Sequence, residues 1–137
     1  FNPYIQLSMQ RVTYFLAASI IAFFMFSCSV QELEKYNENF RGSWRSAVYY
    51  SPQAGDSIRN YLNVDGENSA FGLLCDRNDD FEACLFYAQG KAKYNKANGG
   101  LQIGNSVQNI YAITQEPFVN SDGVWELSID SVSYFKY

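Results

Sequence analysis

Three cysteines, at positions 28, 75 and 84, are the most reactive residue types in this chain of 137 residues. Cys28 ends an apolar segment, whereas Cys75 and Cys84 bracket the acidic stretch CDRNDDFEAC. If that stretch joins two antiparallel strands, the two cysteines can lie opposite each other within bonding range. We therefore predict a Cys75–Cys84 disulfide, formed in an oxidising compartment, with a pair of free buried thiols as the alternative.

The chain has no histidine, which removes the commonest general base and the commonest metal ligand. Carboxylates suited to glycoside chemistry are present at Glu67, Glu82 and Glu126. No pattern in the sequence places two of them across a cleft. Residues 76–80 (DRNDD) follow the first half of a calcium loop, but Phe81 and Tyr87 stand where such a loop needs Gly and Glu. We expect a solvated acidic hairpin tip, and neither an enzyme, a cofactor nor a metal site.

Residues 9–27 have the architecture of an export signal. Arg11 is the only charged residue before the apolar run 12–26. That run is shorter than the roughly 20 residues that a membrane-spanning helix needs. Met25-Phe26-Ser27-Cys28 resembles the lipobox of bacterial lipoproteins, which implies a lipid on Cys28 and attachment to a membrane. A plain secretory signal and an uncleaved anchor helix are the alternatives.

This signal divides the chain into four parts. Residues 1–8 form an upstream extension without fold information, 9–27 the signal peptide, 28–39 a polar tether with a helical turn over 32–36, and 40–137 one β domain. The whole chain carries 10 Lys or Arg against 14 Asp or Glu, and the basic residues form no cluster. Nucleic acid is therefore not an expected partner, because phosphate binding needs a basic face.

After residue 40 the apolar residues alternate with a period near two, and no segment has a convincing helical period. We expect strands at residues 42–50, 58–64, 69–75, 84–94, 101–103, 107–114, 125–130 and 132–137, with Pro117 ending the sixth. In the strand at 84–94, the alternation places Phe86 on the same face as Cys84 and Ala88. Small residues on that face, at 88, 90 and 92, suit a tight spot in a curved sheet. About eight short strands predict an all-β fold, either a small antiparallel up-and-down barrel or a sandwich.

Two motifs carry a family resemblance. Gly42-Ser43-Trp44 resembles the Gly-x-Trp opening of lipocalins, and Trp125-Glu126-Leu127 with Tyr134-Phe135-Lys136 is similar to the ending of short lipocalin-like lipoproteins of Bacteroidetes. The resemblance spans most of residues 40–137 and implies a lipocalin-like β-barrel. A tryptophan at this position is equally compatible with a core residue at the start of a sheet.

Two functions remain open from the sequence. The first is a non-enzymatic binding module of the cell envelope, an outer-membrane lipoprotein facing the periplasm or the cell surface. It would hold a small apolar ligand or a partner protein. Trp44 and Tyr50, which the alternation places on one face of the first strand, would form the site. The alternative is a structural, accessory or inhibitor lipoprotein with a filled core that acts through surface loops. A solid core with an exposed apolar patch would favour this alternative.

Overall fold

The structure is a computed structural model that describes residues 9, 11–14, 29–78, 80–106 and 108–137. Met9 and Arg11–Tyr14 are helical, and no helix within the described residues is long and apolar enough to cross a membrane. Cys28, the lipobox and the upstream extension lie outside the described residues, so lipidation stays a prediction. A boundary after Val30 separates the N-terminal part from the unit that holds most of the sheet.

The described elements are almost all strands, which confirms the all-β class. In chain order they are β1 Val30–Glu32, α2 Leu33–Tyr36, the 3-10 helix η1 Glu38–Phe40, β2 Gly42–Ser46, β3 Tyr49–Ser51, β4 Asp56–Val64, the 3-10 helix η2 Gly66–Asn68, β5 Ser69–Arg77, β6 Asp80–Gly90, β7 Ala92–Asn95, β8 Gly100–Ile103, β9 Ile110–Val119, β10 Trp125–Ile129 and β11 Val132–Lys136. The predicted helical turn over 32–36 is present as α2.

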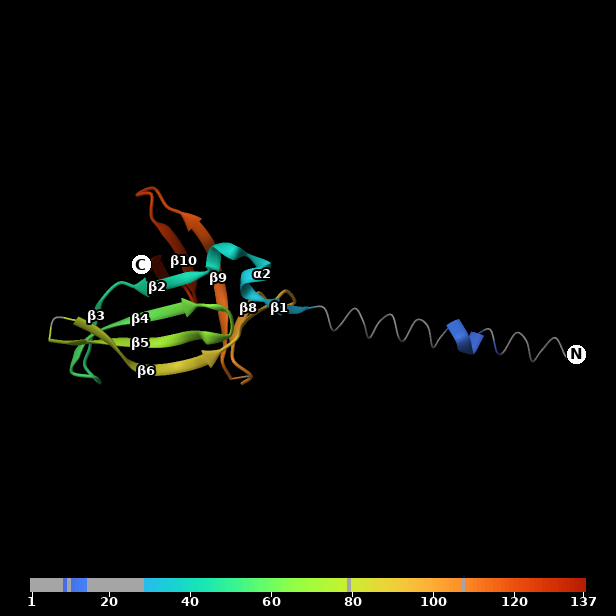
Figure 1. Cartoon of the computed structure of the whole chain (residues 1–137), viewed down its shortest axis with the longest axis horizontal. Coiled ribbons are helices and arrows are strands. Elements are labelled where there is room, and N and C mark those ends of the chain that lie inside the picture. Colours follow the sequence, from blue (N-terminus) through green and yellow to red (C-terminus); the bar gives the residue numbers. More distant parts are fainter. Residues whose placement is uncertain (1–8, 10, 15–28, 79, 107) are drawn as a thin grey trace, which may run out of the picture. The chain divides into compact units, whose positions relative to one another are not determined.

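The strands form one sheet in the order β1-β7-β8-β9-β10-β11-β2-β4-β5-β6, and β3 adds to β4 beside β2. Eleven strands are therefore paired, not about eight. In Figure 1, β2, β4, β5 and β6 lie side by side, while β9 and β10 run steeply across their direction. Most connections are short antiparallel hairpins, as the turn signals in the sequence indicated.

The first expected strand, residues 42–50, is interrupted after Ser46. The Ser46 hydroxyl accepts a hydrogen bond from the Asn60 backbone N–H (2.8 Å), and the Ser46 carbonyl accepts two from the Arg59 guanidinium (3.0 and 2.8 Å). Pairing resumes at Tyr49, opposite Ile58. Because side chains alternate between the two faces of a sheet, this irregularity puts Tyr49, and not Tyr50, on the face of buried Ile58.

Pro117 does not end its strand, contrary to the prediction, because β9 continues to Val119. The register between β9 and β10 shifts at this point. Phe118 pairs with Glu126 and Gln115 pairs with Ser128, so residues 116–117 lie together across from one residue of β10. A proline lacks the N–H that a regular ladder needs, and such an irregularity accommodates it.

The expected strand 84–94 is bent at Gly90 and divides into β6 and β7, which are separated only by Lys91. Gly90 has a φ of 127°, and a Cβ atom there would lie 3.0 Å from the Gly104 Cα atom. Only glycine suits this close approach. The predicted tight spot is thus confirmed. The bend takes the chain from pairing with β5 to pairing with β8.

The core is filled by large side chains from both halves of the sheet. The fully buried ones include Leu33, Phe40, Trp44, Leu62, Val64, Leu101, Ile103, Leu127, Ile129 and Tyr134. Leu33 of α2 and Phe40 of η1 belong to segments outside the sheet. Residues 31–39, expected to form part of a free tether, therefore pack on the sheet and lie in the same compact unit.

Candidate functional site

One half of the β4–β5–β6 hairpins carries large apolar side chains that remain about half exposed. The Phe71 ring packs against Tyr111 of β9 (4.6 Å between centroids) and Tyr134 of β11 (6.1 Å). Beyond Phe71, β5 and β6 remain paired as far as Arg77 and Asp80. The acidic stretch predicted as a loop is therefore mostly strand, and the inner face of the hairpin extends past the crossing strands.

Four residues on this inner face form the candidate site, which we call the tyrosine face: Tyr49, Leu85, Tyr87 and Tyr111. Tyr49, Leu85 and Tyr87 are 45%, 47% and 44% exposed. These exposures are large for aromatic and aliphatic side chains that point to the core side of a sheet.

The contacts of these residues show that they share one face. Tyr49 donates a hydrogen bond from its hydroxyl to Asn60 Oδ1 (3.2 Å), and Asn60 pairs with Leu73, which in turn pairs with Leu85. The Tyr87 ring lies 5.8 Å from the ring of Phe71. Together with the Phe71–Tyr111 contact, these links connect β3, β6 and β9 across the inner side of the hairpin.

Two hydroxyl groups of the tyrosine face have raised pKa values. Partial burial raises the pKa of the Tyr87 and Tyr111 hydroxyls, with smaller contributions from neighbouring tyrosines and, for Tyr111, from Asp130. Burial also raises the pKa of Tyr134 behind them. Asp130 accepts a hydrogen bond from the Ala112 backbone N–H (2.9 Å), so its carboxylate supports the start of β9. This surface offers ring faces and hydroxyl groups, which suit binding.

The predicted ligand residues, Trp44 and Tyr50, do not meet in a site. Trp44 is fully buried, and its indole N–H donates to the Phe40 carbonyl (2.7 Å). Tyr50 is 65% exposed on β3. The prediction that the two share a face is wrong because the irregularity after Ser46 shifts the alternation by one residue. Trp44 is a core residue with a satisfied donor.

The predicted Cys75–Cys84 disulfide is present, with a Cα–Cα distance of 5.7 Å. The two cysteines are not directly opposite, because Cys75 pairs with Glu82 and Cys84 falls within a register shift between β5 and β6. The bond ties β5 to β6 in the uncovered part of the hairpin. It thus stabilises the strands that carry Leu85 and Tyr87.

Sequence reasoning missed Leu85 and Tyr87 and assigned Phe86 to the face of Cys84 and Ala88. Register shifts on either side of Phe86 reverse that assignment. Phe86 instead pairs with Gly72, which pairs with Tyr61, and the Tyr61 and Phe86 rings meet edge to face at 6.3 Å on the outer face. The available signal was the run Leu85-Phe86-Tyr87, since three successive large apolar residues cannot all point to one core.

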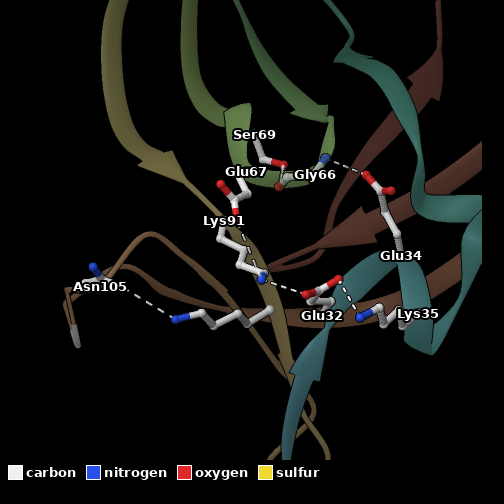
Figure 2. A network of polar contacts seen from close by, with 9 residues as sticks. Glu32, Glu34, Lys35, Gly66, Glu67, Ser69, Lys91 and Asn105 are labelled. Atoms are coloured by element: carbon white, nitrogen blue, oxygen red, sulfur yellow. Dashed lines mark hydrogen bonds and ion pairs between the residues drawn. The ribbon is translucent and has the colours of Figure 1, made fainter.

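The opposite end of the domain, which we call the α2 end, holds the charged network of Figure 2. The Lys91 amine lies 2.6 Å from one Glu32 carboxylate oxygen, and Lys35 lies 3.3 Å from the other. Glu34 accepts a hydrogen bond from the Gly66 backbone N–H (2.7 Å). Lys91 and Lys35 lower the pKa of Glu32, and Glu32 raises the pKa of Lys91.

A cavity of about 130 Å³ at the α2 end is lined by Glu32, Glu34, Gly66, Glu67, Lys91 and Ala92. Small-molecule sites are mostly apolar, whereas the lining of this cavity is largely charged. The charges around this cavity are paired with one another, and buried Leu33 lies beside them in the chain. We therefore interpret the α2 end as a structural closure. Within the described residues, no three His, Cys, Asp or Glu side chains are grouped to hold a metal ion.

Comparisons with protein-family models, with curated proteins and with solved structures found no match to this chain.

Proposed function

We propose that this protein is a lipid-anchored lipoprotein of the bacterial cell envelope that binds a partner protein through the tyrosine face. The supporting observation is a contrast in burial. The core is complete, with Trp44 and Tyr134 buried, yet Tyr49, Leu85 and Tyr87 remain 44–47% exposed. Apolar surface left outside a complete core is typical of interaction sites, and tyrosine combines a large apolar ring with a hydroxyl for hydrogen bonding.

We also propose that the curled sheet works as a small lipocalin-like barrel. Strands β6 and β7 are separated only by Lys91, so together they act as one bent strand with β5 on one side and β8 on the other. The Gly104 N–H donates to the Lys91 carbonyl (3.0 Å) at this bend. Such a barrel would have a filled interior, with α2 over one end and the tyrosine face at the other.

The anchor is the part of the proposal that depends on sequence alone. The lipobox-like segment ending at Cys28 supports an acylated N-terminus in the outer membrane, with the domain facing the periplasm or the cell surface. Replacing Cys28 with Ser should abolish labelling by a clickable palmitate analogue and release the protein from the membrane fraction. Labelling that persists in Cys28→Ser would overturn the anchor.

Site-specific photo-crosslinking tests the binding proposal in intact cells. A photoreactive phenylalanine at position 87 or 49 should join the full chain to one discrete protein, and Leu85→Lys should abolish that product. The control position is 50, because Tyr50 is 65% exposed and lies outside the tyrosine face. Equal crosslinking from 50, or none from 49 and 87, would refute the proposed site.

A small apolar ligand is the second candidate, favoured by the rings of Tyr87 and Tyr111 on two sides of Phe71. Native mass spectrometry of the purified chain distinguishes the candidates. The native chain and Tyr50→Ser should carry a stoichiometric adduct, and Tyr87→Ser should lack it, if the site binds a small molecule. That result would favour a small-molecule ligand over a partner protein.

A further inference from the structure

The chain enters the β domain at the α2 end and is fixed there within a few residues. The Glu32 carboxylate lies 2.6 Å from the Lys91 amine, and the next residue, Leu33, is fully buried. The Glu34 carboxylate then accepts the hydrogen bond from the Gly66 backbone N–H (2.7 Å), as Figure 2 shows. The segment that follows the lipobox is therefore attached to the domain from Glu32 onward, and it is not a free tether.

The length of chain between this attachment and the proposed lipid is short. Only residues 29–31 separate Cys28 from Glu32. Because an extended chain advances by at most about 3.6 Å per residue, the Cα atoms of Cys28 and Glu32 are no more than about 14 Å apart. This limit holds for any conformation of the residues between them. A lipid on Cys28 would thus keep the α2 end close to the membrane.

The side chains of the α2 end suit the headgroup layer of a bilayer. The side chains of Lys35 and Glu67 are 74% and 82% exposed, so this end presents both signs of charge. Charged groups cost free energy in the hydrocarbon region. The α2 end would therefore lie among the hydrated headgroups without entering the hydrocarbon.

The tyrosine face lies a long way from this end along the strands. Strand β4 ends at Val64, close to Gly66, and Tyr49 pairs with Ile58 near the start of the same strand. Six residues separate Ile58 from Val64 along β4, which at about 3.3 Å per residue corresponds to about 20 Å. A bilayer beside the α2 end would therefore leave Tyr49 and its neighbours in water.

We infer that the α2 end is the membrane-facing surface of the domain, held on the lipid headgroups by the short attachment to Cys28, and that the tyrosine face points away from the bilayer. This inference rests on the acylation of Cys28 in the proposed function. It deepens that function, because the partner protein would approach the tyrosine face from the aqueous side.

Short-range fluorescence quenching tests this orientation. The full acylated chain is placed in phosphatidylcholine vesicles in which some headgroups carry a nitroxide. A fluorophore is attached to Lys35→Cys or to Tyr50→Cys; Cys75 and Cys84 are bonded to each other and do not compete for it. The label at 35 should be strongly quenched, and the label at 50 should not. Equal quenching, or stronger quenching at 50, would overturn the inference.

Incorporation of the clickable palmitate analogue separates failure of the anchor from failure of the orientation. An acylated chain with no quenching at 35 would show that the α2 end stands away from the bilayer, and would overturn the orientation alone. A chain that takes up no palmitate would refute the anchor, and the inference with it. Cys28→Ser mixed with the same vesicles is the control, and it should show no quenching at either position.

A longer tether tests whether the short chain length causes the orientation. An insertion of about 20 Gly and Ser residues after Cys28 has an r.m.s. end-to-end distance of about 25 Å. The quenching at 35 should then be lost, while the far-UV spectrum of the folded sheet and the palmitate label are kept. Unchanged quenching in this variant would refute the role of the short attachment.

Discussion

The two ends of the domain use similar residues for opposite purposes. At the α2 end, Leu33 is fully buried, and the charges above it are paired, with Lys91 2.6 Å from Glu32. Tyr36 stacks on Tyr94 with 3.7 Å between ring centroids, and its hydroxyl donates to the Glu116 carboxylate. The polar groups at this end thus have partners within the chain.

At the other end, leucine and tyrosine side chains remain about half exposed to solvent. Leu85 and Tyr87 have the same chemistry as Leu33 and Tyr36, but they are 47% and 44% exposed. The difference teaches that residue type does not mark the site in this protein. The site is marked by large side chains that stay half exposed although they point to the core side of the sheet.

The largest effect on stability is expected at the α2 end, when the same leucine-to-alanine substitution is made at each end. Leu33→Ala should lower the free energy of unfolding by about 2–5 kcal/mol, because it removes buried methyl groups and leaves a cavity. Leu85→Ala should change it by less than about 1 kcal/mol, since Leu85 is 47% exposed. Urea unfolding of both variants provides the measurement. Equal losses would abolish the distinction between a closed and an open end.

The disulfide gives the next largest effect, and it acts on the open end alone. Replacing Cys75 and Cys84 with Ser should reduce stability by roughly 2.7 kcal/mol, the chain-entropy value for a loop of about ten residues. The exchange rates of the backbone amides should rise most in β5 and β6. In β8 and β9 these rates should rise only as much as the loss of global stability explains. A reducing agent should destabilise the native chain and leave the double variant unaffected. Uniform exchange across the sheet would contradict this local role.

Alkaline titration should reveal the buried part of the tyrosine-rich end. Burial raises the folded-state pKa of Tyr87, Tyr111 and Tyr134 above the unfolded value of about 10. Their contribution to stability is therefore fully present below that pH and is lost as pH rises through the folded-state values. The transition temperature should fall as the pH rises above about 10. Tyr134→Phe should make this fall with pH less steep. The same slope in Tyr134→Phe would assign the pH dependence to other groups.

The smallest effect concerns the ion pair of the α2 end. Lys91→Gln should raise the pKa of Glu32 toward its ordinary value of 4.5, because Lys91 is the largest cause of its lowered pKa. The contribution of Glu32 to stability is present above that ordinary value and is lost as pH falls through the lowered one. Carboxyl-resolved NMR measures the pKa directly. Lys93→Gln is the control, since Lys93 contacts Asn105 instead. An unchanged Glu32 pKa in Lys91→Gln would show that the pair is not formed in solution.

Local patterns predicted much of the fold. Alternating apolar residues predicted the strand-rich class, and the cysteine spacing predicted the Cys75–Cys84 bond. The small residues near Gly90 predicted the tight bend. These features depend on neighbours along the chain or on a single hairpin, so their causes are visible in the residues themselves.

Local residue patterns thus specify most of the strands, the disulfide and the bend, whereas contacts between distant segments specify which side chains form the site. The irregularity after Ser46 turns Tyr49 inward in place of Tyr50, and the shifts in β6 turn Leu85 and Tyr87 inward in place of Phe86. A shift of one residue reverses every face in a strand, and hydrogen bonds between distant residues, such as Asn60 to Ser46, set that shift. Burial then depends on how far the crossing strands reach, which the alternating pattern of one strand does not encode.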